Sequence, residues 1–124
     1  MASRCLGVNP LKFIFWRARL LDRLTQCLAL ELGNFDIRAN AILPGLVNGD
    51  RWFNNARRRA GRDGVTFEEV IKNSLSRTAS GRLVDVDEIS ETVIFLASNA
   101  ARSINGQSIS VCGYLQALSE PIHR

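Results

Sequence analysis

The stretch FDIRANAILPG, residues 35–45, decides the fold class. From Phe35 to Leu43 apolar and polar residues alternate except at Ile42, and Pro44-Gly45 ends the run. Such alternation over a short segment bounded by turn residues predicts a β-strand. The additional apolar side chain of Ile42 indicates that both faces of the strand are partly covered, as in a parallel sheet.

A helix is predicted before this strand, from about Arg17 to Leu32. Its apolar residues recur at helical spacing and form one stripe, which consists of Leu20, Leu21, Leu24, Cys27, Leu28 and Leu32. Gly33 follows at the position where a left-handed residue commonly ends a helix. Residues 1–16 show no clear period and are left as an unassigned N-terminal segment.

Further helices are predicted after Pro44-Gly45. An arginine-rich stretch favours a short helix near Arg51 to Ala60. Thr66 and Glu69 have the spacing of a capping box, which predicts a helix from Phe67 to about Leu75. Asp85 and Glu88 repeat this pattern before a helix from Val86 to Ala97, whose inward-facing residues are expected to be Ile89, Val93 and Leu96.

A second strand is predicted from Ser108 to Cys112, after a turn at Asn105-Gly106. Helices that alternate with strands indicate an α/β fold, and right-handed crossovers favour two parallel neighbouring strands. Two strands alone leave rows of backbone donors and acceptors unpaired. A complete doubly wound fold needs about twice these elements. The sequence therefore predicts part of a fold, with an incomplete sheet.

The composition is that of a globular domain, with 124 residues, 46% hydrophobic and 23% charged. No apolar run approaches the roughly 20 residues of a membrane helix, and no secretory cleavage site follows the apolar N-terminal stretch. We therefore expect a cytoplasmic protein without a membrane partner. The cysteines Cys5, Cys27 and Cys112 match no metal site or redox pair, so reduced thiols and no bound metal are expected.

The net charge of +4 comes mainly from arginine, and the densest cluster consists of Arg51, Arg57, Arg58, Arg59 and Arg62. A phosphate-binding strip is one interpretation of this cluster. A solvated surface segment is the favoured one, because no zinc-finger spacing, RNA-binding aromatic motif or basic zipper accompanies it. Nucleic acid is therefore not expected as a partner.

Three segments, in order, resemble the second half of the short-chain dehydrogenase/reductase family. Leu24 to Gly33 is similar to the end of the long catalytic helix of that family. Ile37 to Gly45 is similar to the next strand and to the Pro-Gly turn that faces the nicotinamide. Ile94 to Ser98, followed by Ile104 to Gln107, resembles the late helix and the turn into the last strand.

The resemblance implies the C-terminal part of a Rossmann-like doubly wound fold over residues 17–124. It also implies an oxidoreductase whose complete relatives use NAD or NADP. The turn formed by Pro44, Gly45, Leu46 and Val47 would face the cofactor, although Gly49 stands where many relatives have a threonine. Residues 48–83 match the variable substrate loop. There Trp52, Phe53 and Phe67 could line a pocket, with core or interface packing the favoured interpretation.

The family's catalytic tyrosine and lysine are absent from the sequence, because their positions hold Ile14 and Ala18. The single tyrosine is Tyr114, and Leu118 stands four residues after it. The glycine fingerprint that approaches the cofactor pyrophosphate is absent as well. We therefore expect no catalytic residue, no activity and no bound cofactor for this chain alone.

Other candidate residues are given structural interpretations. His123, next to the C-terminus, is interpreted as part of a frayed end, and Cys112 as a small buried residue. The rival function is a non-catalytic oligomerisation or interaction module that pairs with itself or with a full-length relative. An open sheet edge and the leucine stripe motivate it, because the resemblance implies association through this helix and the last strand.

Overall fold

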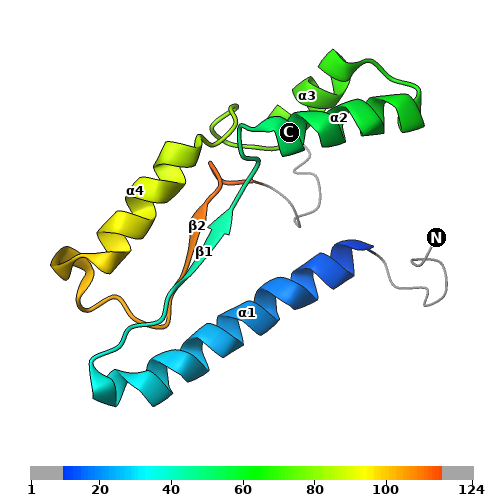
Figure 1. Ribbon diagram of the computed structural model, residues 1–124. Coiled ribbons are helices and arrows are strands. Elements are labelled where there is room, and N and C mark those ends of the chain that lie inside the picture. Colours follow the sequence, from blue (N-terminus) through cyan, green and yellow to red (C-terminus); the bar gives the residue numbers. More distant parts are fainter. Residues whose placement is uncertain (1–9, 116–124) are drawn as a thin grey trace. The chain divides into compact units, whose positions relative to one another are not determined.

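The computed structural model describes residues 10–115 (Figure 1). These residues divide into two compact units. The first unit contains residues 10–41 and 102–108, and the second contains residues 42–101 and 109–115. In chain order, the elements are α1 (Pro10–Leu32), the 3-10 turn η1 (Gly33–Phe35), β1 (Ala41–Pro44), α2 (Asp50–Asp63), α3 (Phe67–Leu75), α4 (Val86–Ala97), η2 (Asn99–Ala101) and β2 (Ser108–Val111).

Helix α1 begins at Pro10, seven residues before the expected start at Arg17. The prediction rested on the spacing of apolar residues from Leu20 onward. Proline is favoured at a first helical position because its φ is already helical and its missing N–H has no partner to lose. The expected start was therefore wrong, while the end at Leu32 is confirmed.

The chain leaves α1 differently from the prediction. Gly33 does not adopt a left-handed conformation but continues into η1, and the left-handed residue is Asp36, with φ of 59°. The Asp36 amide donates to the Gly33 carbonyl at 3.1 Å. Aspartate tolerates this conformation better than most residues because its short polar side chain can hydrogen-bond locally. The left-handed residue thus stands three positions after the expected one, because η1 lies between it and α1.

Strand β1 is consequently shorter than the predicted Phe35 to Leu43. The residues just before Ala41 do not form the regular backbone hydrogen bonds of a strand pair. They hydrogen-bond instead to side chains and to the turn before β2. The Ala39 amide donates to Asn105 Oδ1 at 2.9 Å, and Asn40 Nδ2 donates to the Ile104 carbonyl at 2.9 Å. Asparagine side chains compete with strand pairing in this way because they imitate the peptide group.

The two strands are parallel neighbours, as predicted (Figure 1). The Ala41 amide donates to the Gln107 carbonyl at 2.8 Å, and the Gly45 amide donates to the Val111 carbonyl at 2.9 Å. The residue numbers of the hydrogen-bonded partners increase in the same direction along both strands, as they do in a parallel pair. The turn before β2 is confirmed too, since Gly106 has φ of +71°. The sheet remains incomplete, with two strands.

The predicted helices of the second unit are confirmed. Helices α3 and α4 have the predicted bounds, and α3 carries the complete Thr66–Glu69 capping box. Helix α2 is longer than expected at both ends. Gly64 caps its C-terminus, and the left-handed backbone of this glycine, with φ of 66°, directs its amide to the Ala60 carbonyl.

The core of the second unit is small, and its buried apolar residues are Ala56, Val70, Val84, Leu96 and Ala101. Leu96 faces inward as expected and Ile89 is half-buried, but Val93 is 49% exposed, so that expectation was wrong. A two-stranded sheet offers too little area to bury the apolar faces of helices. Within residues 10–115, no helix has the length and apolarity needed to cross a membrane.

Candidate functional site

The turn Pro44–Val47 leaves the C-terminal end of β1, the edge of a parallel sheet at which ligands bind in open α/β folds. Gly45 lies directly against Cys112 of the segment that follows β2. A Cβ at Gly45 would be 2.6 Å from the Cys112 Cα and 3.0 Å from its carbonyl oxygen. No side chain fits in that space, so the backbone approach at this edge requires glycine.

The second half of the turn pairs with Val84. The Val84 amide donates to the Leu46 carbonyl and the Asn48 amide donates to the Val84 carbonyl, each at 2.8 Å. This makes Val47 and Val84 a parallel bridge. In such a bridge the N–H and C=O of Val47 itself point away from Val84. Neither group has a partner among the described residues, so a donor and an acceptor lie side by side on one residue.

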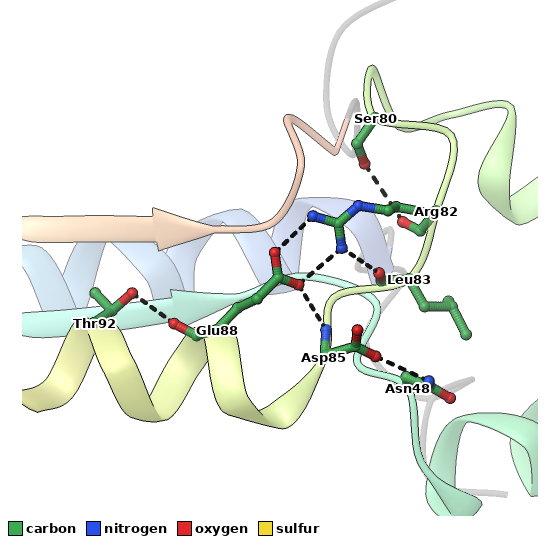
Figure 2. Close-up of polar contacts among 7 residues, drawn as sticks. All are labelled: Asn48, Ser80, Arg82, Leu83, Asp85, Glu88 and Thr92. Carbon is green, nitrogen blue, oxygen red and sulfur yellow. Dashed lines mark hydrogen bonds and ion pairs between the residues drawn. The ribbon is translucent and has the colours of Figure 1, made fainter.

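Polar contacts hold this pairing at the start of α4 (Figure 2). Asn48 Nδ2 donates to Asp85 Oδ1 at 3.0 Å. Arg82 places both terminal nitrogens on the two Glu88 carboxylate oxygens, at 2.6 and 2.8 Å, and the Asp85 amide donates to the same carboxylate at 2.8 Å. Hydrogen bonds of Arg82 and Asp85 thus hold the loop in place before and after Val84.

The hydrogen bonds from Arg82 and from the Asp85 amide lower the pKa of Glu88 from 4.5 to about 2. A carboxyl group with a lowered pKa stabilises the fold above its unfolded value, and this contribution is lost as the pH falls toward the folded value. We expect Glu88→Gln to remove that part of the acid sensitivity between pH 4.5 and about 2, because the amide keeps an acceptor but not the charge. Urea midpoints measured across this range test it.

The matched control for Glu88→Gln is Glu91→Gln, on the same helix, since the carboxylate of Glu91 makes no hydrogen bond or ion pair within the described residues. Its midpoint should fall with acid in parallel with that of the unmodified chain. An identical acid profile for Glu88→Gln would show that the Arg82–Glu88 pair contributes nothing to stability.

A cavity of about 440 Å³ lies in the second unit, beside the paired helices α2 and α3. Its lining consists of Leu46, Trp52, Asn55, Ala56, Arg58, Arg59, Arg62, Val70 and Ser74. Of the three aromatic residues considered from sequence, only Trp52 lines it. Phe53 and Phe67 instead pack on each other, with ring centroids 6.4 Å apart, which agrees with the favoured packing interpretation.

The sequence did not single out the polar lining of this cavity. Arg58, Arg59 and Arg62 are solvent-exposed as expected, but they also border the cavity, which the surface-segment interpretation missed. A signal was present, because Trp52, Asn55, Ala56, Arg59 and Arg62 follow helical spacing and share one face of α2. What could not be read locally was that Val70 and Ser74 of α3 close this face.

The remaining candidates do not join a catalytic arrangement. Cys112 is half-buried rather than buried, and its sulfur accepts from the Leu115 amide at 3.5 Å. Tyr114 is 79% exposed. His123 and Leu118 lie outside the described residues. Within residues 10–115 no cluster of histidine, cysteine, aspartate or glutamate is placed to hold a metal ion.

The relatives found by comparison with known proteins agree with one another. The family model described as Enoyl-(Acyl carrier protein) reductase matches residues 19–114. The chain is 33% identical over 94 residues to 1,6-dihydroxycyclohexa-2,4-diene-1-carboxylate dehydrogenase of Pseudomonas putida, covering 75% of this chain and 35% of that protein. It is 33% identical over 99 residues to L-rhamnose 1-dehydrogenase (NAD(P)(+)) of Azotobacter vinelandii, covering 80% and 35%.

A solved structure gives the same result. The crystal structure of a short chain dehydrogenase family protein from Francisella tularensis subsp. tularensis SCHU S4 superposes with a TM-score of 0.75 at 29% identity, and covers 89% of this chain and 46% of that one. The chain thus spans about a third of the length of the curated relatives described above. Because the family model matches most of its residues, the chain belongs to the short-chain dehydrogenase/reductase family.

Proposed function

We propose that this chain supplies the nicotinamide-facing turn and the substrate-facing helices of an NAD(P)-dependent oxidoreductase. We also propose that the 124 residues alone do not catalyse the reaction. The observation that carries the first part is that the N–H and C=O of Val47, at the carboxyl edge of the sheet, have no partner within residues 10–115. The name of the relative from Azotobacter vinelandii, L-rhamnose 1-dehydrogenase (NAD(P)(+)), supports the choice of cofactor.

The nicotinamide carboxamide fits this pair of groups. A carboxamide offers one amino donor and one carbonyl acceptor, which complement the acceptor and the donor of Val47. The half-buried Leu46, Val47 and Cys112 add apolar surface beside the pair. When bound, the nicotinamide ring supplies or takes up a hydride. Pro44–Val47 would orient the ring, and the Gly45–Cys112 contact would fix the position of the turn.

Two further parts of the reaction have no residues in this sequence. The pyrophosphate of the cofactor needs backbone donors of a glycine-rich turn at a helix N-terminus, and the sequence contains no such motif. Proton transfer needs a positioned acid. The single tyrosine, Tyr114, is exposed and has no lysine four residues after it. These absences support the proposal that the chain alone is inactive.

We expect NADH and NADPH to show no saturable micromolar binding to the purified chain, measured by cofactor fluorescence. Free nicotinamide at millimolar concentration should nevertheless shift the NMR signal of the Val47 amide, because the carboxamide site does not depend on the pyrophosphate site. AMP is the control ligand and should leave that amide unchanged. Micromolar binding of NADH would refute the inactivity proposal, and an unchanged Val47 amide with nicotinamide would refute the turn's proposed role.

The second candidate function is an interaction module, favoured by the exposed leucines of α1. One face of this helix is covered within its unit. Thr25 is 5% exposed, Asn105 Nδ2 donates to the Ala29 carbonyl at 3.4 Å, and the Ser108 hydroxyl donates to Asp22. The leucine stripe lies beside that face and is exposed except at Leu32, with 65% for Leu20 and 53% for Leu24. We propose a second copy or a longer relative as the partner.

A further inference from the structure

The cavity beside α2 and α3 has the size and the mixed lining of a small-molecule site. Its volume of about 440 Å³ falls within the range of roughly 300–1,000 Å³ that is typical of ligand pockets. Its buried wall comes from Ala56, Val70 and Ser74, which are 4%, 5% and 9% exposed. Ser74 is the polar residue of that wall.

The polar part of the lining is positively charged. Arg58, Arg59 and Arg62 border the cavity, and no carboxylate is among the lining residues. Arg62 forms an ion pair with Asp63, with 2.7 Å between Arg62 Nε and Asp63 Oδ1. The guanidinium group of Arg58 makes no hydrogen bond or ion pair with another described residue. Guanidinium groups bind carboxylates through two parallel hydrogen bonds, so this side of the cavity suits an anion.

The apolar part of the lining contains a fixed aromatic ring. Trp52 meets Phe53 edge to face, with centroids 5.1 Å apart and planes at 83°, and Phe53 in turn packs on Phe67. The contacts limit the orientations open to the indole of Trp52. Leu46 continues the apolar wall and belongs to the turn assigned above to the nicotinamide. The cavity therefore connects an aromatic wall, a basic rim and the cofactor-facing turn.

We propose that this cavity binds a small organic anion, namely a carboxylate carried on a flat apolar body. The carboxylate would lie among Arg58, Arg59 and Arg62, and the flat body against Trp52 and Val70. The inference deepens the proposed function by naming a substrate class, and it rests on that function only for the ligand's role as a substrate. Binding itself requires no cofactor.

A nucleic acid fits the same charges less well. Phosphate-backbone binding uses an extended strip of cations, whereas only three of the five clustered arginines border the cavity. Arg57 lies over the Phe67 ring, with its guanidinium carbon 5.2 Å from the centroid, and Arg51 is not part of the lining. The charges are thus gathered around an apolar hollow, which suits an anion with an apolar body.

Benzoate titrated into the full chain tests the proposal, with Trp52 fluorescence as the signal and Trp16→Phe as the background, since the chain has two tryptophans. We expect saturable quenching that weakens with added salt. Benzyl alcohol, which keeps the ring but is neutral, and inorganic phosphate, which lacks the ring, should each bind about tenfold more weakly. Equal binding of benzyl alcohol would overturn the role of the arginines, and equal binding of phosphate would overturn the role of the apolar wall.

Matched variants locate the site on α2. Arg58→Gln/Arg59→Gln should weaken benzoate binding by about tenfold, as expected for losing two partly exposed charge contacts. Arg51→Gln/Arg57→Gln removes the same charge from the same helix and should change the affinity less than about twofold. Equal weakening by both pairs, or competition by duplex DNA at the benzoate site, would overturn the proposal. Because cofactor is absent throughout, a failure here leaves the nicotinamide result at Val47 standing as a separate outcome.

Discussion

Gly45→Val is expected to lower the free energy of unfolding by about 3 kcal/mol or more, because overpacking commonly costs about 1–3 kcal/mol and here the obstructing atoms belong to backbone. A Cβ at this position would meet the Cys112 Cα at 2.6 Å and its Cβ at 2.7 Å. Backbone atoms cannot rotate away, so the two chain segments must separate. Urea denaturation of the variant and of the unmodified chain measures the loss.

Gly61→Ala is the control for this prediction. Gly61 lies inside α2, and nothing is within 4 Å of a Cβ built there. Alanine should therefore stabilise the helix by roughly 0.5–1 kcal/mol, the usual difference between these residues in a helix. If Gly45→Val unfolds at the same urea concentration as the unmodified chain, then Gly45 and Cys112 are not in close contact.

The expected effect at Gly45 also shows what the sequence could not predict. Pro44-Gly45 is recognisable as the end of a strand, because local residue preferences mark turns. The reason for the glycine is a contact with Cys112, far along the chain. Only the pairing of β1 with β2 brings the two together. The same holds for Val47, whose backbone N–H and C=O point away from Val84 because the two residues form a parallel bridge.

Elements with local signals were predicted well. Helices α3 and α4 begin where Thr66 and Asp85 place a capping box, and both were predicted with their observed bounds. A capping box is formed by residues three positions apart, so its energetics are contained in the sequence itself. Parallel pairing of the strands was predicted from the handedness of crossovers, which is nearly invariant.

Elements that depend on distant partners were predicted less well. The strand begins at Ala41 instead of the predicted Phe35. Just before β1, side-chain hydrogen bonds of Asn105 and Asn40 replace the regular pairing of strand backbones. The cavity was missed for a similar reason. Helical spacing places its arginines on one face of α2, but the opposing wall comes from α3, and the packing of two helices is not encoded in either one alone.

Leu24→Glu is expected to turn an associating chain into a monomer, which sedimentation at micromolar concentration measures. Leu24 is 53% exposed beside the covered face of α1, within the leucine stripe. Burying a leucine contributes roughly 1.5–3 kcal/mol, and a two-fold interface counts it twice. Losing both contributions corresponds to a dissociation constant at least about a hundredfold higher, before the cost of burying a carboxylate is added.

Leu30→Glu is the matched comparison for Leu24→Glu, because it makes the same chemical change on the same helix. Leu30 is 80% exposed and lies about 120° around α1 from Leu24, outside the stripe. We expect it to leave association intact. If both variants dissociate, added charge rather than the stripe controls association. If the unmodified chain sediments as one 13.8 kDa species with cooperative thermal unfolding, the stripe needs no partner, and the interaction-module proposal is wrong.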